Sequence, residues 1–351
     1  MTSKKFTTEI GGRTLTAEFT NYAEHANGSC IVTYGETVVM ATAVQGKTPR
    51  EGVDFFPLTV DYEEKFYAAG RILGSRFARR EGRSSDNAIL VSRLIDRTIR
   101  PLFSSKTRNE VQVIVLALSI DEDNDPDVSA ILAASLALAT SDVPWSGPIG
   151  AVRIGKNENG FIINPTYKER AESLLDAVIC GKDGKINMIE AGANEIPEAA
   201  MGEALETAIQ EIEKLSAFQK GIVAEIGKEK AKIALAEAPE EMKAQFKNTF
   251  HARIAEAIYI KEKMLRYEQL NVLRKEWVGY AGEQFPMVHK NIADGLFEEA
   301  VDEIVHDNII DHEKRPDGRG TKELRTIMAK AKILPRTHGS GLFYRGETHV
   351  L

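Results

Sequence analysis

The chain has 351 residues, a formal net charge of −7, 43% hydrophobic residues and 28% charged residues. Because single hydrophobic cores stop growing below this size, we expect two or more folded units. The apolar content excludes predominant disorder, since burial can offset the conformational entropy lost on folding. A membrane-spanning helix is also excluded, because the longest apolar run, residues 111–120, is much shorter than the ~20 residues that a bilayer crossing needs.

The N-terminus and the two cysteines indicate a cytoplasmic protein. Residues 1–9 contain no apolar segment of the kind found in secretory signals. Cys30 and Cys180 each lie in a strand-like apolar run, and two cysteines cannot form a disulfide framework or a zinc site. We therefore expect buried thiols in a reducing compartment.

The N-terminal third predicts a β-meander followed by alternating helices and strands. Apolar and polar residues alternate in four short runs, at residues 6–10, 14–19, 29–34 and 37–44. Ser84, Ser85 and Asp86 supply an N-cap for a helix that continues to about Ile99 and stops at Pro101. Residues 110–119 then predict a fully buried strand, and residues 127–139 predict a helix that packs closely on a sheet.

The helix expected near residues 86–99 has two different faces. One face is apolar and consists of Val91, Leu94, Ile95, Thr98 and Ile99. The opposite face brings three basic residues together, Arg93, Arg97 and Arg100. This pattern predicts a helix that buries one side and presents a row of guanidinium groups on the other.

After residue 144 the pattern changes from strands to helices. Alternation predicts strands at 149–154, 161–163, 177–180 and 186–189. The last two flank Gly181-Lys182-Asp183-Gly184-Lys185, a hairpin turn that lacks the Ser or Thr and the following helix of a phosphate-binding loop. From about Pro197 to Ile310 the pattern is helical, with breaks near Pro239 and residues 279–287. An α/β unit followed by an all-helical segment is therefore expected.

A repeat links the two ends of the chain. Gly28-Ser29 and Gly35-Glu36-Thr37 recur as Gly339-Ser340 and Gly346-Glu347-Thr348, at a constant offset of 311 residues and without a gap. Such a match indicates a duplicated strand–turn–strand unit. Because the second copy stops at its second strand, we expect the natural protein to continue past Leu351.

Positive charge is concentrated in one segment. Residues 71–100 contain eight arginines, no lysine and three acidic residues, for a local charge of +5. Within this segment Phe77 lies among arginines in a loop bounded by Gly74 and Gly82. Arginine neutralises phosphate and an aromatic ring stacks on an unpaired base, so the loop is suited to single-stranded nucleic acid. The alternative is a surface loop whose arginines pair with acids elsewhere in the protein.

Other motifs do not indicate a metal or a nucleophile. Asp121, Asp123 and Asp125 have the spacing of a calcium loop, but Pro126 and Leu132 stand where Gly and Glu are required. We expect a solvated acidic turn with Asp127 as the cap of the following helix. The histidines lack metal-ligand spacing, and no Ser, Cys or Thr stands out as a nucleophile.

Several long motifs resemble bacterial polynucleotide phosphorylase (polyribonucleotide nucleotidyltransferase), and the match extends from the first strand to Leu351. They lie at residues 55–72, 93–103, 147–151, 315–319 and 334–340. The resemblance implies an α/β (α+β) fold: a ribonuclease PH-like domain, related to ribosomal protein S5 domain 2, then an all-helical domain and the start of a second ribonuclease PH-like domain. The expected boundaries are 1–145 and 146–232 for the two parts of the first domain, 233–312 for the helical domain and 313–351 for the truncated second domain.

The same resemblance implies a function. Proteins of this family form a homotrimeric ring and degrade single-stranded RNA from the 3′ end, with inorganic phosphate as co-substrate, Mg²⁺ as the metal and nucleoside diphosphates as products. RNA degradosome components are further candidate partners. The RNA-gripping loop of the family corresponds to Phe77-Ala78-Arg79-Arg80, in which Ala78 replaces a second aromatic ring, and Arg83 adds charge to it. The other basic positions of the family that match here are Arg93, Arg97, Arg100 and Arg319.

The resemblance places the catalytic residues outside this chain. The phosphate-binding serines and paired metal-binding aspartates of the family belong to the second ribonuclease PH-like domain. The corresponding stretches of the first domain are Asp125-Pro126-Asp127 before a helix and Ser173 to Asp176 before a strand. A carboxylate at a helix N-terminus repels an anion, and Asp176 alone is not a two-carboxylate metal site.

We therefore expect this chain to supply RNA binding and the trimer scaffold, and not to phosphorolyse RNA by itself. A catalytically inert RNA-binding ring subunit and a hydrolytic, exosome-like subunit are the alternatives.

Overall fold

The computed structural model describes residues 3–50, 53–72, 74, 82–233, 235 and 237–351. The chain divides into two compact units, Met1–Leu235 and Ala236–Leu351. No helix in the described part of the chain is both long and apolar enough to span a membrane.

A six-stranded sheet forms the first half of unit 1. Its strands follow the order β1-β2-β3-β4-β6-β5, in which β5 runs parallel to β6 and the other neighbours are antiparallel. The predicted meander is confirmed. The bounds are β1 (Lys4–Ile10), β2 (Arg13–Phe19), β3 (Gly28–Tyr34), β4 (Thr37–Pro49), β5 (Leu58–Glu64) and β6 (Asn109–Ser119).

The prediction of a fully buried strand at β6 is wrong. Val111, Val113 and Val115 are completely buried, whereas Glu110 and Gln112 are exposed. β6 therefore has the alternating burial of a strand that is fully covered on one face. The long apolar run hid this alternation because Ile114 and Leu116 on the other face are half-buried.

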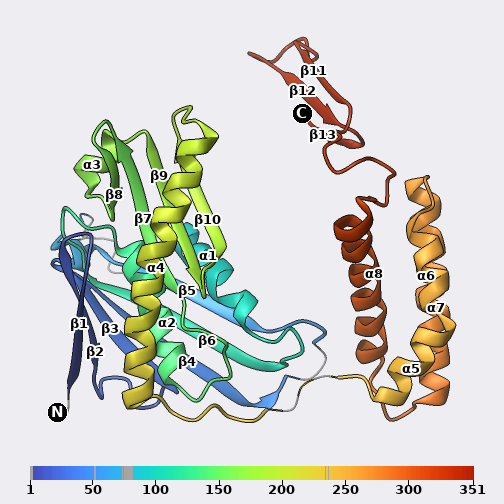
Figure 1. Cartoon of the computed structure of the whole chain (residues 1–351), viewed down its shortest axis with the longest axis horizontal. Helices are drawn as coiled ribbons and strands as arrows, with labels where there is room; N and C mark the ends of the chain where they lie inside the picture. The colour runs from blue at the N-terminus through green and yellow to red at the C-terminus, as the bar shows by residue number, and fades with distance from the viewer. Residues whose placement is uncertain (1–2, 51–52, 73, 75–81, 234, 236) are drawn as a thin grey trace. The chain divides into compact units, whose positions relative to one another are not determined.

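Two helices pack on this sheet. Helix α1 (Asp86–Ile99) begins at the predicted cap, where the Ser85 hydroxyl accepts a hydrogen bond from the Ala88 N–H at 3.0 Å. It buries the predicted apolar face and runs into a short 3₁₀ turn, η2 (Arg100–Leu102). In helix α2 (Pro126–Thr140) every residue is buried, because α2 contacts strands β3 and β4 and also elements of the second half of the unit (Figure 1).

A four-stranded antiparallel sheet of order β10-β9-β7-β8 forms the second half of unit 1. The hairpin predicted near residue 183 joins β9 to β10. Cys30 in β3 and Cys180 in β9 are buried free thiols, as predicted. The bounds are β7 (Gly150–Asn157), β8 (Gly160–Ile163), β9 (Leu175–Lys182) and β10 (Lys185–Ala193), with a 3₁₀ turn η1 (Phe66–Ala69) and helix α3 (Tyr167–Ala171) elsewhere in the unit.

The helical pattern that begins near Pro197 belongs to both units. Its first helix, α4 (Glu198–Ile226), packs against β7 and β9 and is part of unit 1 (Figure 1). The later helices form unit 2 around Trp277, whose indole N–H donates to the Ala293 carbonyl at 2.7 Å. They are α5 (Glu240–Thr249), α6 (His251–Ile258), α7 (Lys263–Gln284) and α8 (Lys290–His312).

The predicted strand–turn–strand repeat is present in the structure. In unit 1, Tyr34 pairs with Thr37 around Gly35, whose φ is +65°. In unit 2, Arg345 pairs with Thr348 around Gly346, whose φ is +62°. Both loops need glycine at the same left-handed position. The second copy consists of β12 (Gly341–Arg345) and β13 (Thr348–Val350), and β11 (Ile327–Ala331) pairs with β12.

The repeat provides a matched test of packing in unit 1. A Cβ at Gly28 would lie 2.2 Å from the Ala137 carbonyl oxygen of α2, whereas a Cβ at Gly339, its repeat counterpart, would meet nothing within 4 Å. Gly28→Ala should therefore destabilise unit 1 by about 1–3 kcal/mol, the usual effect of overpacking. Urea-dependent labelling of Cys30 and Cys180 measures this change, since both thiols are buried in unit 1.

Gly339→Ala is the control and should leave the labelling curve unchanged. Equal curves for the two variants would contradict the close contact between β3 and α2.

Candidate nucleic-acid interface

A groove of about 1010 Å³ on unit 1 brings α1, β5, β9 and β10 together. We call it the α1 groove. One wall carries exposed residues of α1, and the other carries Glu190, Ala191 and Gly192 of β10. Apolar residues of β5 and α1 lie between them, and Asp127, Arg153 and Asp176 line it as well. The lining thus combines apolar side chains with charged groups of both signs, which can fix the orientation of a ligand.

Two of the predicted RNA-binding arginines, Arg93 and Arg97, line this groove, and they differ in their ion pairing. Arg93 is exposed and makes no ion pair with any described residue. Arg97, one turn later on α1, donates to the Glu190 carboxylate at 2.5 Å and contacts the Met188 sulfur at 3.2 Å. Its guanidinium group is thus held against β10.

Arg100, the third arginine of the predicted row, is not among the residues that line the α1 groove. It pairs with Asp96, with Nε 2.8 Å from the carboxylate, and its guanidinium also donates to the Leu58 carbonyl at 3.1 Å. These contacts fasten the end of α1 to β5. Arg100 therefore has a structural role in unit 1, which the helical spacing alone did not indicate.

The remaining predicted residues lie elsewhere. Arg83 is exposed just before α1. Phe77, Arg79 and Arg80 fall outside the residues that the structure describes. Arg319 belongs to unit 2, where it pairs with Asp317 at 2.8 Å and donates to the Glu323 carbonyl at 2.8 Å.

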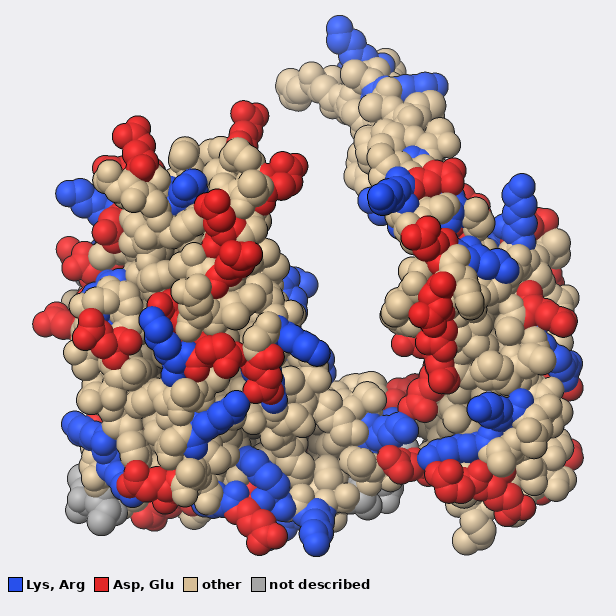
Figure 2. Space-filling model, viewed as in Figure 1, with Lys and Arg blue, Asp and Glu red and all other residues tan. Residues whose placement is uncertain are grey.

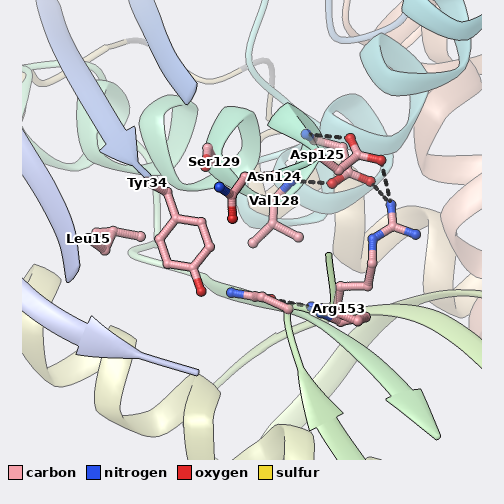
Figure 3. Close-up of a pocket in the computed structure, with 10 residues that line it drawn as sticks. Leu15, Tyr34, Asn124, Asp125, Val128, Ser129 and Arg153 are labelled. Carbon is pink, nitrogen blue, oxygen red and sulfur yellow. Dashed lines mark hydrogen bonds and ion pairs between the residues drawn. The ribbon is translucent and has the colours of Figure 1, made fainter. Parts of the chain in front are cut away.

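An ion network borders the α1 groove, and we call it the Asp–Arg network. Its members are Asp125, Asp127 and Asp176 with Arg153 and Arg170. Arg153 of β7 binds Asp127 and Asp176, and Figure 3 shows its guanidinium directed at the carboxylates near the start of α2. Arg170 of α3 binds Asp125 and reaches the second oxygen of Asp176 at 2.9 Å. Each carboxylate is therefore paired with a guanidinium.

The protonation equilibria follow from burial and from these partners. Burial raises the pKa of Asp127 to about 6, and the charge of Asp125 adds to this effect. Burial also acts to raise the pKa of Asp176, but the charges and hydrogen bonds of Arg153 and Arg170 prevail and lower it. For Arg153, burial opposes the charged form, yet the three carboxylates raise its pKa, so the guanidinium stays charged.

The N-terminus of α2 differs from the prediction. The cap is Asp125, whose side chain accepts from the Asp127 N–H at 3.2 Å, and Asp127 lies in the first helical turn instead. Asp127 is 4% exposed, so it does not belong to a solvated turn. Two carboxylates now occupy the helix end that would attract an anion, which disfavours phosphate there.

The Asp–Arg network also does not fit a divalent cation. Three nearby carboxylates would suit Mg²⁺ if they were free, but two guanidinium groups already bind them. Among the described residues no group of three His, Cys, Asp or Glu is arranged to hold a metal ion. The enclosed space beside Tyr34 and Asn124, drawn in Figure 3, measures about 20 Å³ and is too small for a nucleotide.

Arg153 and Arg170 border the site, and the sequence analysis did not single them out. Arg153 is the one charged residue within the apolar run 149–154, a signal that it must find buried partners. No comparable signal marks Arg170, which lies in the polar helix α3.

Comparisons with known proteins agree with this architecture. Three family models match: "3' exoribonuclease family, domain 1" over residues 11–144, "3' exoribonuclease family, domain 2" over 147–211, and "Polyribonucleotide nucleotidyltransferase, RNA binding domain" over 241–320. The chain is 45% identical to a polyribonucleotide nucleotidyltransferase of Alkaliphilus oremlandii, over 99% of this chain and 49% of that protein. The corresponding protein of Thermomicrobium roseum is 46% identical, over 98% of this chain and 44% of its own length.

The chain belongs to the polyribonucleotide nucleotidyltransferase family. It spans about half the length of the curated relatives that it matches. The predicted ribonuclease PH-like fold followed by a helical segment is confirmed. Among solved structures, a chain of the Archaeoglobus fulgidus exosome with RNA bound to the active site is similar with a TM-score of 0.47 and 22% identity, covering 59% of this chain and 87% of that one.

The Asp–Arg network predicts a large loss of stability when its central cation is removed. Arg153→Met keeps the apolar stem but leaves the buried Asp127 carboxylate without a guanidinium partner, which should cost unit 1 about 3–5 kcal/mol. Urea-dependent labelling of Cys180 is a direct readout, since Cys180 pairs with Ala151 across β7 and β9. Adding Asp127→Asn should recover part of the loss.

Lys4→Met, which removes an exposed pair with Glu225 in the same unit, is the control and should change little. A loss no greater for Arg153→Met than for Lys4→Met would contradict the network.

Proposed function

We propose that the protein is a polyribonucleotide nucleotidyltransferase, a phosphate-dependent 3′-to-5′ exoribonuclease that degrades single-stranded RNA and mRNA and releases nucleoside diphosphates. In this proposal the chain contributes RNA binding and part of the scaffold of a homotrimeric ring. Inorganic phosphate is the nucleophile, and Mg²⁺ stabilises the charge that develops on the transferred phosphoryl group. The family membership and the exposed, unpaired Arg93 among the described residues of the α1 groove support it.

The Asp–Arg network is the observation that supports assigning RNA binding, and not catalysis, to this chain. Phosphorolysis needs a place for the attacking phosphate and carboxylates free to bind a metal. Asp125 and Asp127 cover the α2 N-terminus, and Arg153 and Arg170 pair with all three carboxylates. We derive no catalytic step at this position, and assign unit 1 to binding.

The α1 groove offers the chemistry that single-stranded RNA requires. Arg93 and Arg97 supply guanidinium groups for phosphates, and Leu90 and Ala191 are apolar neighbours for base or sugar. Arg83 extends the positive charge beyond the N-terminus of α1. Phe77, Arg79 and Arg80 are proposed to add a stacking ring and two further phosphate contacts.

Residues 71–100 carry a local charge of +5, so the excess of acidic residues lies elsewhere in the chain. Helix α8 of unit 2 carries a row of exposed acidic side chains, visible as a red column in Figure 2. Its members are Glu298, Glu299, Asp302, Glu303, Asp307 and Asp311. A net charge of −7 is therefore compatible with a nucleic-acid partner, because an RNA strand would interact with the local charge of residues 71–100.

A catalytically inert RNA-binding ring subunit is the second candidate, because the Asp–Arg network supports binding without cleavage. A serine-rich loop and two spaced aspartates in a second ribonuclease PH-like copy would distinguish the enzyme from this scaffold. A hydrolytic subunit differs from both, since its RNA degradation would not depend on phosphate.

RNA binding by the arginines predicts a change in salt dependence. For single strands each phosphate contact contributes about −0.7 to the slope of log K against log salt. Arg93→Ala should therefore weaken binding of a labelled oligoadenylate and flatten the slope by about 0.7, and Arg79→Ala with Arg80→Ala should flatten it by about 1.4. Fluorescence anisotropy over a salt series measures both.

Arg253→Ala is the matched control, because Arg253 is an exposed arginine of unit 2 that pairs with Glu276. If affinity stayed unchanged across the salt series in the Arg93 and the Arg79/Arg80 variants, these residues would not be RNA contacts.

A further inference from the structure

The two arginines of the α1 groove differ in what restrains them. Arg93 and Arg97 are separated by one helical turn and line the same groove. Arg93 has no ion pair among the described residues. Arg97 is held by the Glu190 carboxylate at 2.5 Å, the Met188 sulfur at 3.2 Å and the Ile189 carbonyl at 3.4 Å. β10 therefore supplies every hydrogen-bond partner of the Arg97 side chain found among the described residues.

Glu190 differs from the other acids that line the groove. Asp96 pairs with Arg100 at the end of α1, and Asp127 and Asp176 belong to the Asp–Arg network. Glu190 alone among these lining acids pairs with an arginine proposed to bind phosphate. Its side chain is 61% exposed and that of Arg97 is 52% exposed, so both remain accessible from solvent.

We infer that Glu190 competes with RNA phosphate for Arg97 and thereby lowers the affinity of the α1 groove for single-stranded RNA. The carboxylate occupies the position on the guanidinium that a phosphate oxygen would take. Exposed ion pairs are weak and screened by salt, so a phosphate can displace Glu190, but each binding event must break this pair. This inference rests on the proposed RNA binding and identifies a residue that tunes it.

The competition predicts an increase in affinity when the charge of Glu190 is removed. Glu190→Gln keeps the size of the side chain but frees Arg97, so an oligoadenylate should bind about two- to fivefold more tightly at low salt. The salt slope should steepen by up to about 0.7, the value for one further phosphate contact. Anisotropy titrations of the full chain measure both quantities.

Glu225→Gln is the matched control. It removes the same charge from an exposed pair, Glu225 with Lys4, and neither residue lines the α1 groove. Any general effect of net charge on RNA binding should appear equally in this variant. Only Glu190→Gln should raise the RNA affinity beyond this general effect of net charge.

Arg97→Ala in two backgrounds separates competition from a merely structural role. If Glu190 restrains Arg97, this substitution should weaken RNA binding more in the Glu190→Gln background than in the wild type. If the pair of Glu190 with Arg97 had only a structural role, Arg97→Ala would weaken RNA binding equally in both backgrounds.

Three outcomes would overturn the inference. Equal affinities of Glu190→Gln and Glu225→Gln would remove Glu190 from RNA binding, as would equal effects of Arg97→Ala in the two backgrounds, and both leave the proposed function standing. If the wild-type chain failed to bind oligoadenylate at low salt, the proposed RNA binding itself would fall, and this inference with it.

Discussion

The burial of Arg153 is the constraint on which the rest of unit 1 depends. A guanidinium in an apolar strand is tolerated only if carboxylates pair with it, and Asp127 and Asp176 do so from two different elements. This interaction joins β7 and β9 of one sheet to α2, which packs on the other sheet. Breaking it would leave the buried Asp127 carboxylate uncompensated within the apolar core that both halves of unit 1 share.

The same interaction determines what the α1 groove can do. Because Arg153 and Arg170 bind all three carboxylates, the groove has no free acid cluster for a metal at this position. Because Asp125 and Asp127 occupy the start of α2, it has no helix end for phosphate. Arg93 and Arg97 remain as the proposed phosphate-binding groups of the groove, and Glu190 pairs with the second of them. These features support the proposal that unit 1 binds an RNA strand and does not cleave it.

Local features of the chain could be predicted from the sequence because their causes are local. The cap at Ser85, the apolar face of α1 and the two Gly-Glu hairpins each depend on residues within a few positions of one another. The family resemblance then supplied the order of the units. The alternating burial of β6 was not predictable in this way, because it depends on which face of the sheet other elements cover.

The candidate site was predicted only in part, for the same reason. The sequence drew attention to Asp125, Asp127 and Asp176, but the arginines that pair with them are distant in the chain. Arg153 lies 26 positions from Asp127, and Arg170 lies 45 positions from Asp125. Likewise, helical spacing placed Arg97 and Arg100 together without indicating that Glu190 and Asp96 would bind them. Pairing between distant elements is a property of the tertiary structure. The RNA contacts themselves stay predictions.

The central claim is that this chain holds RNA without phosphorolysing it. The most direct measurement incubates the purified chain with poly(A), inorganic phosphate and Mg²⁺, and quantifies ADP together with the length of the recovered RNA. We expect bound RNA of unchanged length and no ADP above a mock preparation. Phosphate-dependent release of ADP by the chain would contradict the account.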